Sequence, residues 1–556
     1  MAKFSDLPNE LVEFVYAYLS QGDLCTACRL NRGLHNLVIP FLYRNVDLFI
    51  RSGDKVPRID RFCMNVSKDK RLASRVETIR FGPSPDRGVQ EGQRWLARDS
   101  HFDDNAMFDL AMKALENESL VSRGDYLKDA IMMREYAAYA AMIVLILPSL
   151  QTLHLADFKY SSLDHLHTIL RNLNPGADWN RRHASDNLIQ RLSSISAVSF
   201  NVDTLNGVAY LSDTSRFNLE PQLNLSGVKC LEFSIPEGQE RVGAAAAWSL
   251  THRLVSSPRT TILTKLIIRH STSALRSLEP LLGSAPQLQS LAYDFYYDSN
   301  DRSDAEARWI DLSAWNDALP KRLETLVLSV ENCDSGAFPF KQPKIGEKLF
   351  GYLDLTNFTK LHTLEVPIPF LTGDANFSIT TEIYPLLPPN LRHLSLRADM
   401  SQAQHQFPLD LSLLPRGLTF QETEDQLRHA DNARMDVSFM FHAALVMLDF
   451  ATDLETISVW QAADPSLSWF DGQIRDFTQT CRNKSIKGHL LYPMILRWKN
   501  KEHWNLVREV TVNDPSRIMA TPLHTLCRGQ RAGIPLGLAS QYHLHALRNH
   551  QVLLGR

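Results

Sequence analysis

The most regular hydrophobic pattern along the chain is a six-residue phrase with apolar residues at its first, fourth and sixth positions. The last two positions are two residues apart, so on a β-strand both side chains point to one face. The first apolar residue would enter the same core from the preceding turn. Copies of the phrase begin at Val76, Leu150, Ile195, Val228, Leu263, Leu288, Leu323, Leu361, Leu391 and Leu454.

Neighbouring copies of the phrase are expected to pack side by side. No single strand of this kind buries its apolar face alone, whereas stacked strands share one core. Several copies follow a proline that favours a turn, as at Pro320 and Pro388. We therefore expect an α/β fold in which residues about 70–470 form an irregular solenoid with a curved parallel sheet. The alternative is an α/β protein of another topology, because such phrases also arise by chance in leucine-rich sequence.

The phrase resembles the strand of a leucine-rich repeat, but its spacing is irregular. Most copies lie 25 to 45 residues apart, against about 20–29 in regular repeats. Shortly after the last leucine, regular repeats carry Asn or Cys, which bonds to the backbone of the turn. In this chain the corresponding positions hold residues other than Asn or Cys, among them Phe158, Glu331 and Asp399. We therefore expect that the internal side-chain ladder of regular repeats is missing.

The first fifty residues predict three short helices. Pro8 suits the first turn of a helix, and Leu11, Val15 and Leu19 recur every four residues as one apolar stripe. Gln21-Gly22-Asp23 predicts a break, with Asp23 as the cap of a second helix from Leu24 towards Leu30. A third helix is expected from about Gly33 to the residue before Pro40. A unit this small buries little surface and normally needs a partner.

This pattern resembles the F-box. The residues that match the family pattern are Leu7, Pro8, Glu10, Leu11, Val15, Leu19, Asp23-Leu24, Arg29 and Leu37. One departure is Leu34, where the family often has tryptophan. The resemblance implies that a Skp-type adaptor protein binds Leu7, Pro8, Leu11, Val15, Leu19 and Leu24. The alternative is a generic amphipathic helical segment that opens a larger domain.

Together the two patterns resemble the F-box proteins with divergent leucine-rich repeats, of the kind abundant in fungi. The expected domains are an F-box at 1–50, the solenoid at 70–470 and a C-terminal cap or extension at 471–556. A helical insertion is expected at about 90–148, and its apolar run from Tyr136 to Leu147 predicts a buried helix. That run is shorter than the roughly 20 residues that a membrane helix needs. A group of aromatic residues near the end favours a terminal cap, with a binding hot spot as the alternative. The group comprises Trp460, Trp469, Phe470, Trp498 and Trp504.

Composition narrows the class of protein. The chain of 556 residues has 59 Lys and Arg against 62 Asp and Glu, a net charge of −3, so it lacks the bulk basic charge typical of proteins that bind nucleic acid or anionic membranes. Seven cysteines are too few for a disulfide scaffold. With no apolar signal-peptide core at the N-terminus, a cytoplasmic or nuclear location is expected.

We find no motif that indicates catalysis. Nucleophile-elbow, phosphate-loop and zinc-protease patterns do not occur. Cys25 and Cys28 have no further ligands at zinc spacing, so we interpret them as packing residues. The His165/His167 and His543/His545 pairs are assigned surface or capping roles. No catalytic residue, cofactor or metal site is predicted.

The sequence thus predicts a non-enzymatic substrate receptor of an SCF-type ubiquitin ligase. The F-box would bind the adaptor and, through it, a cullin, and the solenoid would present an unidentified target protein. One alternative is a repeat scaffold for protein–protein interaction that is not linked to ubiquitination, with the N-terminal helices acting as its cap. Another is an enzyme of unfamiliar fold. Neither nucleic acid nor a membrane is an expected partner.

Overall fold

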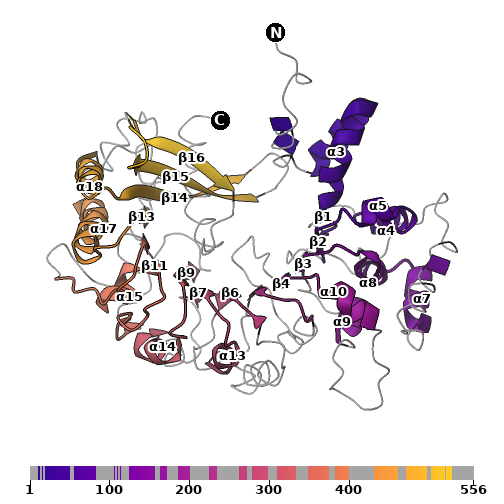
Figure 1. Ribbon diagram of the computed structural model, residues 1–556, viewed down its shortest axis with the longest axis horizontal. Coiled ribbons are helices and arrows are strands. Elements are labelled where there is room, and N and C mark those ends of the chain that lie inside the picture. The colour runs from indigo at the N-terminus through magenta and orange to yellow at the C-terminus, as the bar shows by residue number, and fades with distance from the viewer. Residues whose placement is uncertain are drawn as a thin grey trace, which may run out of the picture. The chain divides into compact units, whose positions relative to one another are not determined.

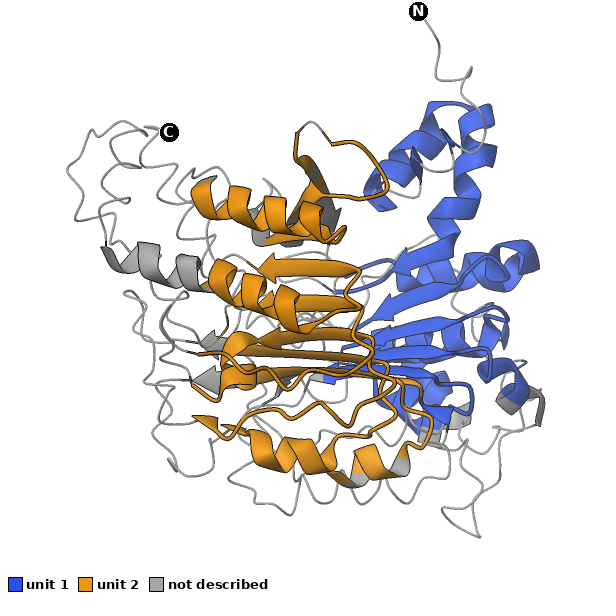
Figure 2. Ribbon diagram, turned by 60° about the vertical axis from the view of Figure 1, so that its left-hand side comes forward, with its two compact units in different colours: residues 1–203, 210–233, 253–263 blue, residues 204–209, 234–252, 264–556 orange. Residues whose placement is uncertain are grey.

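The computed structural model divides the chain into two compact units (Figure 2). Unit 1 comprises residues 1–203, 210–233 and 253–263, and unit 2 comprises residues 204–209, 234–252 and 264–556. The structure describes residues 11–12, 15–16, 19, 21–50, 56–82, 106, 109–110, 113, 124–156, 163–171, 186–200, 225–234, 262–271, 279–298, 310–333, 349–374, 382–397, 399, 431–460, 471–497, 503–519 and 521–528.

Unit 1 combines helices with a parallel sheet. The strands follow one another in chain order, each paired with the next, as β1 (Asn45–Asp47), β2 (Thr78–Phe81), β3 (Thr152–Leu155), β4 (Ala197–Phe200) and β5 (Cys230–Ser234). The helices are α2 (Gln21–Leu30), α3 (Arg32–Arg44), α4 (Ile59–Lys68), α5 (Lys70–Ala73), α7 (Gly124–Met132), α8 (Tyr136–Ile146), α9 (Asp164–Arg171) and α10 (Asp186–Leu192). Figure 1 shows α4, α8 and α9 along one side of β2–β4.

The apolar run from Tyr136 forms α8, and the prediction of a buried helix is confirmed. Every residue from Tyr136 to Leu145 is buried, as expected for a helix that is apolar all round. Tyr136 also joins two strand ends. Its hydroxyl donates to the carbonyl of Leu48 at 2.6 Å and accepts the backbone N–H of Gly82 at 3.1 Å. The helix is thus fixed to the sheet by hydrogen bonds as well as by packing.

The second and third helices differ in extent from the sequence prediction. Helix α2 begins at Gln21, so Gly22 and Asp23 lie inside its first turn, where backbone N–H groups have no acceptor within the helix in any case. Helix α3 begins after Asn31, whose Oδ1 accepts the N–H of Leu34 at 2.8 Å. It continues through Pro40 to Arg44. Packing on both sides of the proline outweighs the loss of its N–H donor, since Val38 is buried and Phe41 packs against the same core.

Unit 2 contains a longer, mostly parallel sheet. Its strands pair in the order β6 (Lys265–Ser271), β7 (Ser290–Asp298), β9 (Thr325–Cys333), β11 (Thr363–Pro367), β12 (His393–Arg397), β13 (Thr456–Trp460), β14 (Lys487–Arg497), β15 (His503–Asn513) and β16 (Leu523–Arg528). β15 and β16 are antiparallel to their neighbours. A separate two-stranded sheet pairs β8 (Ile310–Asp311) with β10 (Leu349–Phe350). The described helices of this unit are α13 (Glu279–Ser284), α14 (Leu312–Ala318), α15 (Ile368–Thr372), α17 (Asp431–Phe450) and α18 (Asp471–Asn483).

Each phrase predicted as a strand is a strand, and its apolar positions are buried. Neighbouring copies are in register. In unit 1, Ile79 lies opposite Leu153 and Leu153 opposite Val198; in unit 2, Leu326 lies opposite Leu364, and Leu364 opposite Leu394. The predicted mixed α/β fold with a parallel sheet is therefore confirmed. The sheets extend beyond 70–470 at both ends, to β1 before the range and to β14–β16 after it.

A backbone ladder accompanies the phrases at the start of the strands. The carbonyl of Glu77 accepts the N–H groups of Gln151 and Thr152, and that of Gln151 accepts those of Ser196 and Ala197. The same double acceptance recurs at Ser196, Thr264, Gln289, Glu324, His362 and Arg392. Strand entry is thus satisfied by main-chain groups, which need no particular side chain. The ladder therefore does not depend on the Asn or Cys that the sequence lacks.

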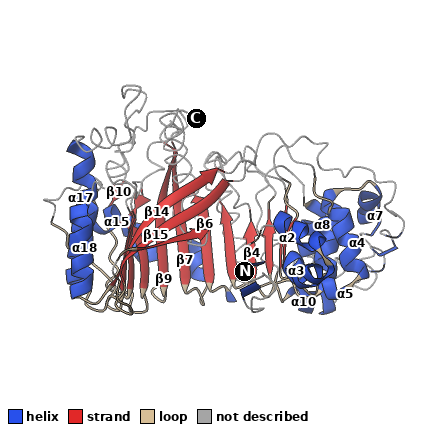
Figure 3. Ribbon diagram, turned by 90° about the horizontal axis from the view of Figure 1, so that it is seen from above, coloured by secondary structure: helices blue, strands red, loops and turns tan. Residues whose placement is uncertain are grey.

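The leucine positions face the helices, and the alternate positions form a second sheet face. In unit 2, Tyr293 and Phe295 of β7 contact Trp315 of α14, with ring centroids 4.8 and 5.1 Å apart. In unit 1, Phe200 of β4 meets His167 of α9 at 6.0 Å. Figure 3 shows α17 and α18 of unit 2 side by side. The residues between the leucines therefore point away from the helices.

Candidate functional site

The N-terminal helical segment divides its apolar residues between two faces. Val12 and Tyr16 are buried, at 6% and 4% exposure, whereas Leu11 is 51% and Val15 is 39% exposed. Residues four apart share one side of a helix, so Leu11 and Val15 form one outward stripe and Val12 and Tyr16 form the inward one. Leu11 and Val15 are two of the six residues that were predicted to bind an adaptor.

The other predicted contact residues have different surroundings. Leu24 is buried in a cluster with Val12, Tyr16 and Val38, and Leu19 packs partly buried against it. Leu24 therefore stabilises the helices from within, and in this structure it is not available as a contact residue. Leu24 lies on the side of α2 that faces this cluster and is the buried residue of that helix. Leu7 and Pro8 lie outside the described residues.

Three further observations concern residues of this helical region. Leu34, which replaces the tryptophan frequent in the F-box pattern, packs partly buried against the cluster. Leu30 and Leu37, by contrast, are 68% and 47% exposed and enlarge the apolar surface. Cys28 also packs against the cluster, and burial followed by the charge of Cys25 raises the pKa of its thiol. A raised pKa disfavours the thiolate needed for metal or redox chemistry, which agrees with a packing role.

The second sheet face of unit 1 carries a polar row that crosses all five strands. Asp47, Arg80, His154, Ser199 and Glu232 lie side by side in register. The guanidinium of Arg80 lies 4.0 Å from the ring centroid of Phe49 and 3.8 Å from the carboxylate of Asp47. Side chains on neighbouring strands are close enough to contact one ligand together. The row therefore brings charged and polar groups from five strands together on one face.

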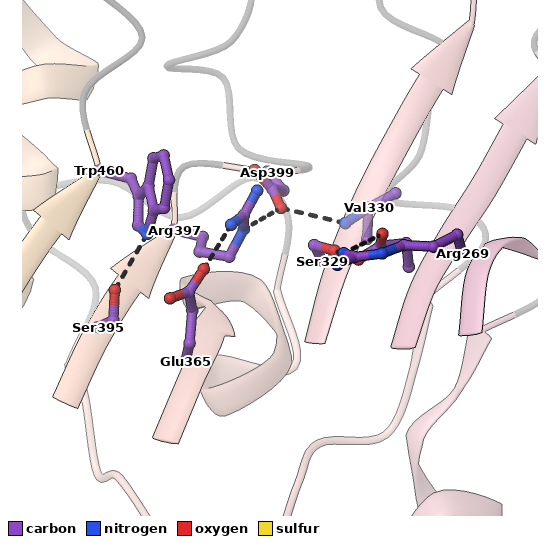
Figure 4. Close-up of polar contacts among 9 residues, drawn as sticks. Arg269, Ser329, Val330, Glu365, Ser395, Arg397, Asp399 and Trp460 are labelled. Carbon is purple, nitrogen blue, oxygen red and sulfur yellow. Dashed lines mark hydrogen bonds and ion pairs between the residues drawn. The ribbon is translucent and has the colours of Figure 1, made fainter. Parts of the chain in front are cut away.

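The second face of unit 2 holds a buried polar network (Figure 4). Arg397, on β12, donates from Nε to Asp399 and from Nη1 to Glu365 of β11, both at 2.6 Å. The same Asp399 carboxylate accepts the backbone N–H of Val330 in β9 at 3.0 Å. Three strands are thus connected through one arginine and two carboxylates.

The charged state of Arg397 is fixed by these partners. Burial lowers the pKa of the guanidinium, but the nearby charges of Asp399 and Glu365 outweigh this effect and raise it above its ordinary value. The ring of Trp460 adds a cation–π contact at 4.7 Å, and its Nε1–H donates to Ser395 at 3.0 Å. Arg397 is only 2% exposed, so this network braces the sheet and does not offer a free cation to a ligand.

A second pair continues the network towards β6. Arg269 of β6 donates from Nη1 to Asp294 of β7 at 2.9 Å, and the hydroxyl of Ser329 in β9 donates to the other oxygen of the same carboxylate. The sequence analysis predicted none of these polar contacts. The signal was present beside the apolar positions of the phrases. Glu365 lies between two of them, and Arg269, Asp294, Ser329 and Arg397 each directly follow the last apolar position of a phrase.

Three histidines contact other side chains of their own unit: His165, His167 and His489. His489 of β14 meets Glu509 at 2.8 Å and Thr511 at 3.2 Å, and both contacts involve Nδ1. A ring that meets both groups through one nitrogen cannot relay a proton between them. His165 pairs with Glu135 at 3.1 Å, while His167 is buried against Phe200 and is not a surface residue as predicted.

Comparison of the sequence with protein-family models and with curated proteins finds no match in either case. Among the residues that the structure describes, no group of three or more His, Cys, Asp or Glu side chains is placed to hold a metal ion. In the same described part of the chain, no helix has both the length and the apolar character required to cross a membrane.

Proposed function

We propose that the protein is the substrate receptor of an SCF-type ubiquitin ligase, in which the N-terminal helices bind a Skp-type adaptor. The observation that carries this proposal is the outward stripe of Leu11 and Val15, which are 51% and 39% exposed while their neighbours Val12 and Tyr16 are buried. Exposed apolar side chains on a small helical unit favour burial against a partner. Burial of a fully exposed Leu or Val contributes roughly 1.5–3 kcal/mol, and because Leu11 and Val15 are about half exposed, covering each would contribute about half of that.

The repeat body supplies the second half of the proposal. Parallel strands in register leave one sheet face turned away from the helices, and in unit 1 that face carries Arg80, His154 and Glu232, each partly exposed. A target protein that binds this polar row would be held near the adaptor, the cullin and the ubiquitin-charged enzyme. The receptor itself would contribute proximity rather than chemistry, by raising the effective concentration of the lysines of the target. A cytoplasmic or nuclear location fits this role.

The decisive experiment is co-purification of the full chain with a recombinant Skp-type adaptor. The double variant Leu11→Glu/Val15→Glu should lose adaptor binding, because two carboxylates would be buried without partners. Both side chains are partly solvent-exposed in the isolated protein, so the variant should keep the thermal unfolding midpoint of the wild type. Adaptor binding that survives the double change would contradict the docking assignment.

A matched control uses exposed apolar residues of unit 2. Phe350 and Tyr384 are 58% and 70% exposed, and the variant Phe350→Glu/Tyr384→Glu introduces the same number of charges. It should bind the adaptor as the wild type does. Equal loss of binding in both double variants would indicate a general effect of surface charge and not a specific docking surface.

One observation favours the alternative of a repeat scaffold whose N-terminal helices act as a cap. Helix α3 ends at Arg44 and β1 begins at Asn45, without a linker between them. Arg44 is also tied to the sheet region, because its carbonyl accepts the N–H of Glu77 and its Nε donates to the Glu77 carboxylate at 2.8 Å. A cap of this kind would stabilise the sheet whether or not it binds an adaptor.

A further inference from the structure

A cavity of about 560 Å³ lies in unit 1 between the N-terminal helices and the turn that leads into β2. Its volume falls within the range of about 300–1,000 Å³ that is usual for ligand sites. Apolar residues from the first helical segment and from α3 form much of its wall, and polar residues from α3 and from the end of α5 onward form the remainder. The residues that line it are Val12, Tyr16, Asn36, Leu37, Pro40, Phe41, Arg44, Ser74, Arg75 and Glu77. We call it the α3 groove.

The α3 groove contains an unpaired cation. Arg75 is exposed, and its side chain makes no hydrogen bond or ion pair with any residue that the structure describes. Arg44 is engaged by Glu77 at 2.8 Å but keeps 55% of its side chain exposed. The lining of the groove thus has two arginines and one carboxylate, Glu77, which pairs with Arg44. The groove therefore has an excess of positive charge beside its apolar wall.

The surrounding sequence strengthens this charge. Residues 21–77 contain eleven Lys and Arg against six Asp and Glu, a net charge of +5 in a chain whose total is −3. Lys68, Lys70 and Arg71, which precede the groove residues Ser74 and Arg75, are all exposed. A concentrated positive field of this kind attracts acidic partners and increases their rate of association.

We propose that the α3 groove binds an acidic segment of a partner protein that presents one bulky apolar side chain. The apolar side chain packs among Leu37, Pro40 and Phe41, while flanking carboxylates pair with Arg75 and with the exposed part of Arg44. The apolar wall favours this occupant over a nucleic acid, whose phosphates would gain nothing from apolar contacts. The surface differs from the Leu11 and Val15 stripe, since neither residue lines the groove.

The test uses the full chain and a fluorescein-labelled peptide of alternating aspartate and glutamate with one central phenylalanine. Binding followed by fluorescence anisotropy should weaken about tenfold in Arg75→Glu, since the change replaces an attraction by a repulsion. It should also weaken in Leu37→Asn, which removes part of the apolar wall. Arg71→Glu is the matched control, because Arg71 is also exposed but does not line the groove. This variant should retain most of the affinity.

Two further probes separate the proposed occupant from other anions. The same peptide with glycine in place of phenylalanine, and a single-stranded oligonucleotide of equal charge, should both bind more weakly. Equal binding of either probe, unchanged affinity in Arg75→Glu, or no binding of the acidic phenylalanine peptide to the wild type would each overturn the proposal. The peptide contains no adaptor sequence, so this result and the adaptor experiment can fail independently.

Discussion

The carboxylate of Asp399 accepts the backbone N–H of Val330 at 3.0 Å, although the two residues are 69 positions apart. The reason lies in the strands between them. β11 pairs with β9 only as far as Val327, because β11 ends at Pro367 and the chain turns into α15. The N–H of Val330 is buried beyond that point, and a side chain from the vicinity of β12 takes the place of the missing strand.

Replacement of Asp399 should therefore destabilise unit 2 strongly. Asp399→Ala removes the acceptor for Val330 and one of the two carboxylates that hold buried Arg397, for which we expect a loss of about 3–5 kcal/mol. The measurement is urea unfolding followed by circular dichroism. The matched control is Glu455→Ala, which removes the exposed Arg392–Glu455 pair at 3.6 Å and should cost less than about 1 kcal/mol. Similar losses in both variants would show that Asp399 does not bridge the strands.

Gly82 should not tolerate a side chain. Its φ is +111°, a region that favours glycine, and an added Cβ would lie 1.8 Å from the carbonyl oxygen of Ala156. Gly82→Ala should lower the unfolding midpoint of unit 1 markedly or prevent folding. Gly283→Ala, in helix α13 where nothing lies within 4 Å of the added atom, should be neutral or stabilise by up to about 1 kcal/mol. A thermal melt of both variants compares the two effects directly.

Two buried thiols should make stability decline at alkaline pH. Burial raises the pKa of Cys63 and of Cys481 to about 12, against about 8.5 for a free thiol. Between these values the unfolded chain has released protons that the folded chain still holds. The free energy of unfolding therefore falls as pH rises, by at most about 1.4 kcal/mol per pH unit for each thiol.

Unfolding in urea at about pH 8 and pH 10 measures this dependence. The double variant Cys63→Ala/Cys481→Ala should show a smaller decline between the two pH values than the wild type does, because other groups that titrate in this range are unchanged. An identical decline would mean that neither thiol keeps its proton in the folded protein.

The position of a truncation should decide whether the N-terminal helices are a separate docking unit or a cap. A variant that lacks residues 1–44 keeps β1 and the hydrogen bonds of Leu48 and Ile50 to the end of β2. If the helices are a docking unit, this variant should remain folded and should lose only adaptor binding. If they are a cap, it should unfold. Removal of residues 1–50 should destabilise the sheet under either hypothesis, because it also removes the edge strand that pairs with β2.

The sequence by itself determined where the phrase strands lie. A strand that alternates apolar and polar residues after a turn is specified locally, so Leu150–Leu155 and Leu391–Leu396 were predictable from their own residues. The same holds for α8, whose uninterrupted apolar run has no solution except burial. The sequence did not predict β1 or β14–β16. Asn45–Asp47 is too short to show a pattern, and the antiparallel pairing of β14–β16 depends on partner strands.

Only the tertiary structure decided which polar residues meet. Arg397 and Glu365 are 32 positions apart, and their contact depends on the register between β11 and β12, which no local spacing encodes. The N-terminal helix shows the same limit. Its sequence identified Leu11 and Val15 as apolar, but Val12 and Tyr16 are apolar as well, and only packing against Leu24 and Val38 determined which pair faces inward.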